Sequence, residues 1–399
     1  IVKENIAGII TETGGTTSHS AILARALEIP AVLSVEGVAS SLKNGDTVVV
    51  DGSEGAVIVN PDDNTVAEYS KKRDAFLAER KELENYRGRE TKSASGEVYE
   101  LFCNIGKPED AVKAVDADGE GVGLFRTEFL FMDRTSIPTE DEQFEAYKKA
   151  ALILKGKSLI IRTLDIGGDK DIPYLGLEKE ENPFMGFRAI RYCLKNRELF
   201  KSQIKAILRA SAFGDIKIMF PLITTMDELR EGKKLVAECK ADLRNMGINF
   251  NENIQVGVMV ETASAAVIAD MLAKEADFFS IGTNDLTGYT MACDRGNNDV
   301  SYLYSPLQPS VLRMIKRTIE CGVQNGISVG MCGEAAANKL MIPLLISFGL
   351  TEFSVSAPSV LNVRKIISTW TKEEADKVTA NVLEMSTQQE IVEYLKSVV

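Results

Sequence analysis

The sequence contains a single histidine among its 399 residues, and its six cysteines show no CxxC spacing. That scatter argues against a zinc knuckle or a disulfide framework and favours a reducing cytoplasm. The apolar runs are only strand-length and are broken by charge, so no transmembrane helix is predicted. Lys3, Glu4 and Asn5 interrupt the N-terminus, so no signal peptide is expected either.

The charge balance is acidic, with 46 Lys and Arg against 58 Asp and Glu and a formal net charge of −12. An acidic protein is a poor partner for a phosphate backbone, so no nucleic-acid binding is expected. The candidate site residues described below are nevertheless largely arginine. A locally basic pocket in an acidic protein suits a small anionic ligand.

The first 60 residues alternate strand, glycine-rich turn and helix patterns. Residues 6–11 predict a strand, residues 20–27 a helix with one buried stripe, and residues 47–51 and 56–59 a hairpin. A unit of about 60 residues buries only a marginal fraction of its surface. The sequence opens almost directly in a core strand, so we expect further residues upstream.

Residues 61–90 differ in composition from what precedes them. Pro61 and the acidic pair at 62–63 mark a helix start, and the following residues are rich in Glu, Lys, Arg and Ala. This pattern predicts a solvated connecting helix between an N-terminal domain, 1–60, and a larger domain, 91–399.

Apolar, β-rich runs alternate with helical segments through the rest of the chain, which is typical of a parallel sheet. Eight such runs fit the eight strands of a (β/α)8 barrel, and a doubly wound open sheet is the alternative, although no GxGxxG follows the first strand. The eight candidate strands are 100–104, 123–126, 159–163, 217–221, 255–261, 278–283, 328–332 and 352–356.

The histidine lies in a glycine-rich turn between a predicted strand and a predicted helix, in the run GGTTSHS from Gly14 to Ser20. The glycines permit close approach by an anion, and the free N–H groups of the helix start favour negative charge. The same partial positive charge favours a neutral, nucleophilic imidazole at His19. A capping histidine without chemistry is the plainer interpretation, and the surrounding motif argues against it.

This motif, continued by AILA to residue 24, Arg25 and IPAV at 29–32, resembles the phosphohistidine domain of phosphoenolpyruvate-utilising enzymes. Within that group the whole chain is similar to the enzyme I family of the bacterial sugar phosphotransferase system. The resemblance implies that His19 carries a phosphoryl group taken from phosphoenolpyruvate. It also implies a swivelling phosphohistidine domain at 1–60, truncated at its start, a helical linker and a phosphoenolpyruvate-binding TIM barrel.

Four candidate arginines, Arg126, Arg162, Arg188 and Arg295, come one each from the motifs GVGLFRTEF, IIRTLDIGGDK and NPFMGFRAIR and the pair Asp294-Arg295. Such a set would be destabilising when buried unless a polyanion neutralised it, and guanidinium forks bind phosphate and carboxylate in pairs of hydrogen bonds. The resemblance implies that Arg126, Arg162, Asn284, Asp285 and Arg295 hold phosphoenolpyruvate, with Arg188 as a further active-site arginine. Lys170 is a weaker candidate.

Two carboxylates, Glu261 and Asp285, follow predicted strands. Together with substrate oxygens they form a donor set typical of Mg²⁺, and the resemblance assigns them that role. Strand-end acids also cap helices, so this second interpretation stays open.

Cys332 ends a predicted strand in VGMCGE. A buried cysteine is usually a small apolar residue, but at a cationic mouth its thiol pKa is expected to be lowered. The resemblance implies that Cys332 protonates the enolate of pyruvate.

The resemblance also concerns partners and competing functions. It implies a homodimer through the barrel and onward transfer to the histidine-containing phosphocarrier protein, although the helical domain that docks this carrier is expected upstream of position 1. Thr16 stands where the family usually has Arg, and EAAAN at 334–338 replaces an EMAGD-like run. Pyruvate phosphate dikinase and phosphoenolpyruvate synthase share these modules but need an ATP-binding domain. A phosphoenolpyruvate-sensing paralogue and an inert fragment are two further hypotheses.

Overall fold

The computed structural model of the chain describes residues 6–13, 24, 29–132, 134–167 and 172–399. The chain divides into two compact units, Ile1–Asn85 and Tyr86–Val399. The division falls inside the segment 61–90 that the sequence predicts as a linker. The predicted helix at 20–27 lies outside the described residues except for Ala24.

The first unit contains two small sheets. Strands β1 (Ile9–Ile10) and β2 (Ala31–Val32) pair in parallel, and β3 (Val48–Asp51) and β4 (Ala56–Val59) form an antiparallel hairpin. The hairpin predicted from the β-rich runs is thus confirmed. A single turn of helix, α2 (Val38–Ser41), precedes it.

Helix α3 (Asp63–Leu83) supplies the helix predicted after the hairpin. It begins as the acidic start predicts, because the Asp62 carboxylate accepts the Thr65 N–H at 2.7 Å and caps the helix. None of its side chains is buried, and Phe76 and Leu77 are both more than half exposed. The helix is therefore solvated on all sides within its own unit.

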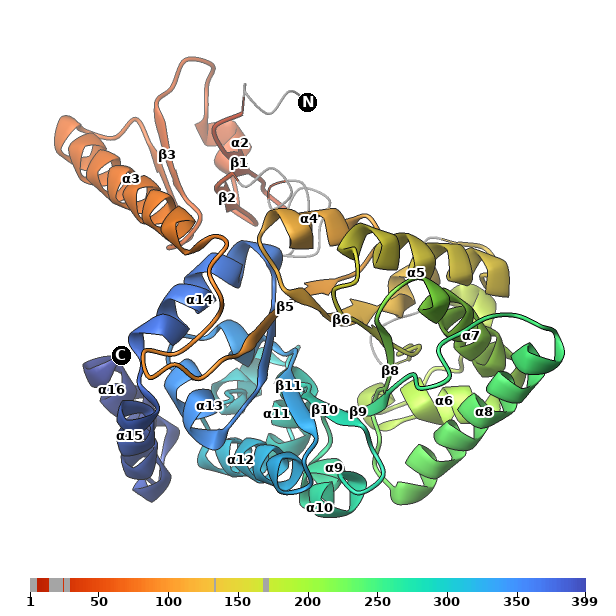
Figure 1. Cartoon of the computed structure of the whole chain (residues 1–399). Coiled ribbons are helices and arrows are strands. Elements are labelled where there is room, and N and C mark those ends of the chain that lie inside the picture. The colour runs from red at the N-terminus through yellow and green to blue at the C-terminus, as the bar shows by residue number, and fades with distance from the viewer. Residues whose placement is uncertain (1–5, 14–23, 25–28, 133, 168–171) are drawn as a thin grey trace. The chain divides into compact units, whose positions relative to one another are not determined.

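The second unit is a closed barrel of eight parallel strands, ordered β10-β11-β12-β5-β6-β7-β8-β9 (Figure 1). All eight predicted strands are present within one or two residues of their predicted ends, so the (β/α)8 fold class is confirmed and the open sheet is excluded. The strands are β5 (Glu100–Ile105), β6 (Gly121–Arg126), β7 (Leu159–Arg162), β8 (Ile216–Phe220), β9 (Val256–Val260), β10 (Phe278–Ile281), β11 (Ser328–Met331) and β12 (Glu352–Val355).

Helices follow the strands and surround the ring (Figure 1). They are α4 (Asp110–Asp116), α5 (Glu140–Leu154), α6 (Ala189–Lys195), α7 (Arg197–Ala210), α8 (Met226–Asn245), α9 (Ala263–Val267), α10 (Ala269–Leu272), α11 (Thr283–Met291), α12 (Pro309–Gln324), α13 (Ile342–Phe348), α14 (Val360–Thr369), α15 (Lys372–Glu384) and α16 (Gln388–Val398). Short 3-10 turns η3 (Thr127–Leu130), η5 (Pro183–Met185) and η8 (Glu334–Ala337) occupy loops after β6, β7 and β11.

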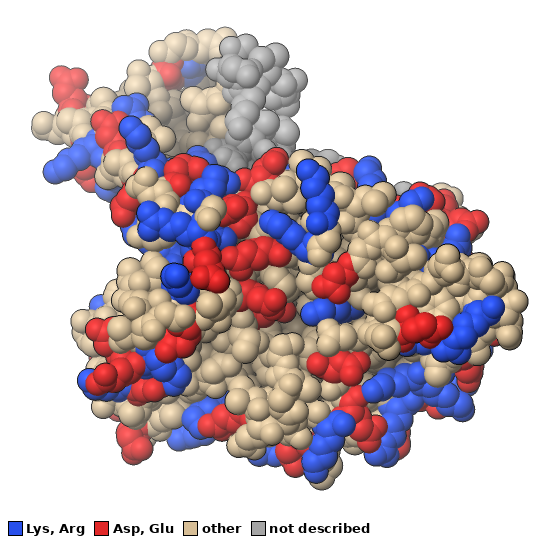
Figure 2. Space-filling view, viewed as in Figure 1, with Lys and Arg blue, Asp and Glu red and all other residues tan. Residues whose placement is uncertain are grey.

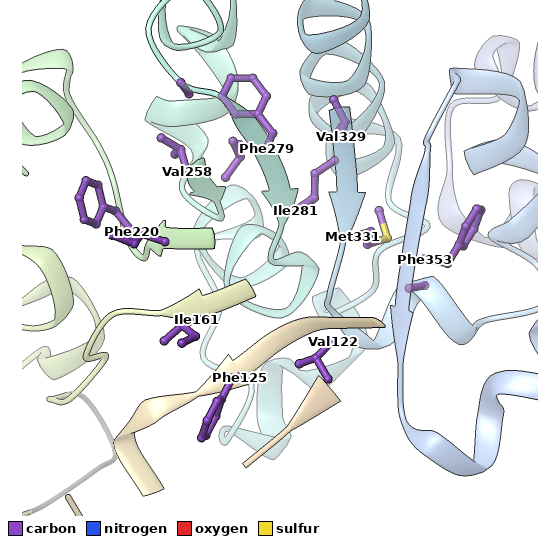
Figure 3. Packing of buried hydrophobic residues seen from close by; sticks show 14 of the residues in the cluster. Val122, Phe125, Ile161, Phe220, Val258, Phe279, Ile281, Val329, Met331 and Phe353 are labelled. Carbon is purple, nitrogen blue, oxygen red and sulfur yellow. The ribbon is translucent and has the colours of Figure 1, made fainter. Parts of the chain in front are cut away.

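The core lies between the strands and these helices, and Figure 3 shows its strand-borne side chains. Phe125 of β6 meets Tyr147 of α5 edge-on at 5.8 Å, and Phe220 of β8 meets Phe200 of α7 at 5.9 Å. A second, smaller cluster fills the inside of the barrel. Its members are Leu124, Ile160, Met219, Met259, Phe278 and Cys332.

The surface carries charges of both signs, and the cysteines form no disulfide among the described residues. On the face shown in Figure 2, acidic and basic side chains are interspersed. All six cysteines are free, and five of them are buried. Among the described residues, none of the helices combines the length and apolar character needed to cross a membrane.

Candidate active site

The predicted site residues of the barrel gather after the carboxyl ends of its strands. Arg126 and Arg162 are the last residues of β6 and β7, and Glu261 and Cys332 directly follow β9 and β11. Strands of a closed parallel barrel end at one rim, where such enzymes place their reactive groups. Asp285 differs from its predicted place at a strand end, because β10 stops at Ile281 and Asp285 lies in the first turn of α11.

Arg162 is only 5% exposed and is held by two carboxylates. Its guanidinium lies 2.7 Å from Glu128 of η3 and 3.0 Å from Asp165. Burial alone would lower the pKa of Arg162, but Glu128, Asp165 and Glu261 outweigh it and raise that pKa. The guanidinium is thus a fixed, permanently charged donor group.

Arg188 is similarly buried and shares a partner with Arg162. Its Nη2 lies 2.9 Å from Asp165 and 3.2 Å from Asp285, and its Nη1 donates to the Tyr289 hydroxyl at 3.3 Å. Burial would lower the pKa of Arg188, and the carboxylates, led by Asp165, raise it instead. Gly167 makes this position possible, because a Cβ there would lie 2.6 Å from that of Arg188.

These ion pairs correct one argument from the sequence. Buried arginines were expected to need a bound polyanion for neutralisation, and instead the protein supplies Glu128, Asp165 and Asp285 for the purpose. The Nε atoms of Arg162 and Arg188 are buried without a hydrogen-bond partner among the described residues. A buried donor left unpaired costs free energy, so both atoms favour a ligand that accepts hydrogen bonds.

Glu261 is 1% exposed, and its Oε1 accepts the Leu222 N–H at 2.7 Å. Leu222 has a left-handed backbone, with φ of 54°, which is strained for a non-glycine residue. The helix after β9 is capped by Thr262, whose hydroxyl accepts the Ala265 N–H. The alternative role of Glu261 as a helix cap is therefore excluded.

The carboxylates near Glu261 outnumber the buried guanidinium groups that they face. Burial raises the pKa of Glu261, the carboxylates of Asp285 and Asp165 raise it further, and Arg162 and Arg188 oppose the rise. Four carboxylates, those of residues 128, 165, 261 and 285, thus face two buried guanidinium groups. A bound divalent cation would relieve this imbalance, and carboxylate oxygens are the donors that Mg²⁺ prefers.

Protein side chains alone do not complete a metal site there. Within the described ranges, no group of three or more His, Cys, Asp or Glu side chains is arranged to hold a metal ion. Glu261 and Asp285 therefore fit Mg²⁺ only as a pair that leaves further positions for water or substrate oxygens.

Two further arginines lie at the margin of this cluster. Arg126 is half-buried and makes no ion pair with any residue that the structure describes. Arg295 lines an open cavity of about 500 Å³ together with Phe184 and residues 294 and 296–298. The Phe184 ring lies 5.7 Å from both the Arg188 and the Arg295 guanidinium carbons, within range of a cation–π interaction.

Asn284 and Cys332 bring the loops after β10 and β11 together. The Asn284 Oδ1 accepts the Glu334 N–H at 3.2 Å. Cys332 is 2% exposed and belongs to the apolar cluster inside the barrel. Burial raises the pKa of its thiol to about 11, so the lowered pKa expected from the sequence is wrong for this site without ligand. The Ser280 hydroxyl and the Arg162 and Arg126 guanidinium groups oppose this rise, and Glu261 adds to it.

Two predicted residues, His19 and Lys170, lie outside the described residues. Sequence reasoning in turn missed Glu128, Asp165 and Phe184. Each stands within two positions of a predicted arginine or in the same motif, as in RTE and RTLD. The signal for the two acids was the need of a buried arginine for a carboxylate partner.

Comparison with known proteins agrees with this geometry. Residues 80–371 match the family described as PEP-utilising enzyme, PEP-binding domain, and residues 1–55 match PEP-utilising enzyme, mobile domain. Among solved structures, a citrate lyase from Burkholderia xenovorans LB400 is 12% identical, covers 77% of this chain and 92% of its own, and has a TM-score of 0.43. That likeness is too low to bear on function.

Curated relatives are much more similar. The phosphoenolpyruvate-protein phosphotransferase of Bacillus subtilis strain 168 is 50% identical over 99% of this chain and 69% of its own length. That of Staphylococcus carnosus strain TM300 is 48% identical over the same shares. The chain therefore belongs to the phosphoenolpyruvate-utilising enzymes, and within them to the phosphoenolpyruvate-protein phosphotransferase family.

Proposed function

We propose that this chain transfers the phosphoryl group of phosphoenolpyruvate to His19 and releases pyruvate. The phosphoryl group then passes to the histidine-containing phosphocarrier protein in sugar uptake. The observation that carries the proposal is the pair of buried, acid-held arginines, Arg162 and Arg188, at the mouth of a barrel of this family.

The arginines bind and orient the substrate. Phosphoenolpyruvate carries a phosphate and a carboxylate, and guanidinium forks suit both groups. Arg126, Arg295 and Asn284 complete the substrate set, with Arg188 beside it. Because carboxylates already hold Arg162 and Arg188 in place, little reorganisation is needed as charge develops on the transferring phosphoryl group.

Glu261 and Asp285 would hold Mg²⁺. When bound, this ion supplies charge neutralisation for the phosphate and for the enolate oxygen of the leaving pyruvate. The excess of buried carboxylates over guanidinium groups supports this assignment.

Cys332 donates the proton that turns the enolate into pyruvate. A donor must hold its proton until the enolate forms, and burial keeps the thiol protonated at neutral pH by raising its pKa to about 11. Its place in the apolar cluster also shields the thiol from water.

We propose three functional parts: a phosphohistidine domain at 1–60, a helical linker at 61–90 and the barrel at 91–399. His19 and the barrel belong to two compact units, so the phosphoryl group passes from one unit to the other when the histidine is charged. We further propose a homodimer through the barrel and a cytoplasmic location, which the six free cysteines favour.

Labelling with ³²P-phosphoenolpyruvate and Mg²⁺ tests the proposal. We expect acid-labile, base-stable label on the wild-type chain and none on His19→Ala, while equilibrium binding of phosphoenolpyruvate to that variant stays within a few-fold of wild type. Binding without any label on the wild-type chain would instead favour a sensing role and overturn the proposal.

A further inference from the structure

The inside of the barrel carries a short chain of polar side chains beside Cys332. Asn104 of β5 donates through Nδ2 to the Cys332 carbonyl at 3.0 Å and to the Ser354 carbonyl at 3.3 Å. The Ser354 hydroxyl of β12 in turn donates to the Asn104 Oδ1 at 2.7 Å. The amide of Asn104 is thus held on both sides and reaches past β12 to the end of β11.

The backbone at Cys332 is fixed from the opposite side as well. The Cys332 N–H donates to the Ile281 carbonyl of β10 at 3.1 Å. A Cβ on the next residue, Gly333, would lie 1.9 Å from the Thr283 hydroxyl oxygen, so the loop packs directly on the start of α11. With its N–H bound to β10 and its carbonyl bound to Asn104, the peptide that carries the thiol has one orientation.

The barrel makes room for this chain at a local irregularity. The β5–β6 register shifts between Cys103 and Asn104, which leaves Gly123 of β6 unpaired. A Cβ at Gly123 would lie 2.5 Å from the Ser354 hydroxyl, so only glycine leaves space for that side chain. The sequence therefore provides a bulge, a glycine and a serine that together place one asparagine.

We propose that Asn104, held by Ser354, is a positioning residue that aims the Cys332 thiol at one face of the enolate. The inference rests on the proposed function. In this step the electron pair of the enolate forms a C–H bond at C3 with the thiol proton. The S–H bond breaks, and the resulting thiolate regains a proton from solvent. Loss of Asn104 frees the carbonyl of Cys332 and lets the thiol shift, and a displacement of 1 Å can cost about 100-fold in rate.

The test follows the stereochemistry of the product in the full 399-residue chain. Phosphoenolpyruvate that carries ²H and ³H at defined positions on C3 gives a chiral methyl group when one face is protonated in ¹H₂O. We expect one configuration from wild type and nearly racemic pyruvate from Asn104→Ala and from Cys332→Ala. In Asn104→Ala, pyruvate formation is expected to lag about 10- to 100-fold behind ³²P-labelling of His19, which stays within a few-fold of wild type.

Asn325→Ala is the matched control, because its Nδ2 also donates to a cysteine carbonyl, that of Cys321, at 2.8 Å and away from the site. We expect wild-type configuration from it and partial racemisation from Ser354→Ala, which leaves Asn104 in place. Retained configuration and rate in Asn104→Ala would overturn the inference alone. Equal loss of label and configuration in both the Asn104 and Ser354 variants would assign these residues a general structural role instead. Failure of wild type to label His19 would overturn the proposed function itself.

Discussion

Buried ion pairs govern the behaviour of single residues at the mouth of the barrel. Asp165 is 2% exposed and bridges Arg162, the last residue of β7, and Arg188, which directly precedes α6. Removal of one member of such a set leaves a buried charge without its partner, which costs more than the pair itself contributes.

Asp165→Asn is therefore expected to lower the free energy of unfolding of the barrel by about 3 kcal/mol, measured by urea denaturation. Asp270→Asn is the control, because Asp270 pairs with Arg317 at 2.8 Å but both side chains are nearly half exposed. That change is expected to cost less than about 1 kcal/mol. Equal effects of the two substitutions would contradict the role assigned to Asp165.

A second buried acid, Glu352, lies at the opposite, amino-terminal end of β12. Burial raises its pKa to about 8, the neighbouring Glu100 adds to the rise, and Lys217 opposes it. Its Oε1 has no hydrogen-bond partner among the residues that the structure describes. Because the folded state holds the proton more tightly than the unfolded chain, this residue destabilises the fold increasingly as pH rises from about 4.5 to about 8.

Glu352→Gln is expected to be more stable than wild type near pH 8, by about 1.4 kcal/mol for each unit of pKa shift removed. Near pH 4.5 the two proteins are expected to be nearly equal in stability. Thermal unfolding across this pH range measures the difference. Glu320→Gln, on the surface of α12, should show no such pH-dependent gain. A constant difference between wild type and Glu352→Gln at all pH values would disprove the buried titration.

Helix starts are the clearest local signals at the scale of elements. Four helices, α5, α8, α15 and α16, begin with a threonine whose hydroxyl accepts the N–H three residues on, while a glutamate there returns the bond. These capping boxes follow directly from the sequence pattern T-x-x-E. Helix α8 is the longest of them and carries its apolar side chains on one face.

Thr225→Ala, at the start of α8, is expected to lower the free energy of unfolding by about 1 kcal/mol, because the Glu228 N–H loses its acceptor. Thr225→Ser keeps the hydroxyl and should stay close to wild type. Chemical denaturation measures both variants, and ³²P-labelling of His19 is expected to be unchanged in each. An equal loss in the alanine and serine variants would show that the methyl group matters rather than the cap.

At the scale of the whole molecule, the barrel is a compact unit that includes the end of the linker. Arg364, 2% exposed, donates to the Thr91 hydroxyl at 2.9 Å and pairs with Asp118 and Glu120. It also donates to the Tyr86 carbonyl at 3.2 Å. These contacts fasten the first residues of the unit to α14 and to the loop between α4 and β6.

A chain of residues 86–399 alone is therefore expected to fold and to bind phosphoenolpyruvate in the presence of Mg²⁺ within a few-fold of the full chain. It should take up no ³²P-label, because it lacks His19. Calorimetric binding and thermal unfolding measure the two properties, with full-length His19→Ala as the control. Loss of binding in the shorter chain alone would mean that residues before Tyr86 contribute to the substrate site.

The order and type of the barrel elements followed from the sequence, because strands buried on both faces appear as short apolar runs between helical segments. Eight such runs fit a closed barrel, and the pairing of β10 with both β9 and β11 and of β12 with β5 in the structure closes the ring. The same rule placed Arg126, Arg162, Glu261 and Cys332 at one rim, since each ends or directly follows a strand. This rule misplaced Asp285, because β10 ends early and helix α11 begins at Thr283.

The sequence by itself thus determined the order of strands and helices and the candidate residues that follow the strands. Only the tertiary structure decided how those residues are held: Asp165 between two arginines, Asn104 on the carbonyl of Cys332, and the thiol pKa raised to about 11. Periodicity reports which face of a strand is buried, whereas ion pairing and desolvation depend on side chains from strands up to 250 residues apart. Such side chains come into contact only when the strands close into the barrel.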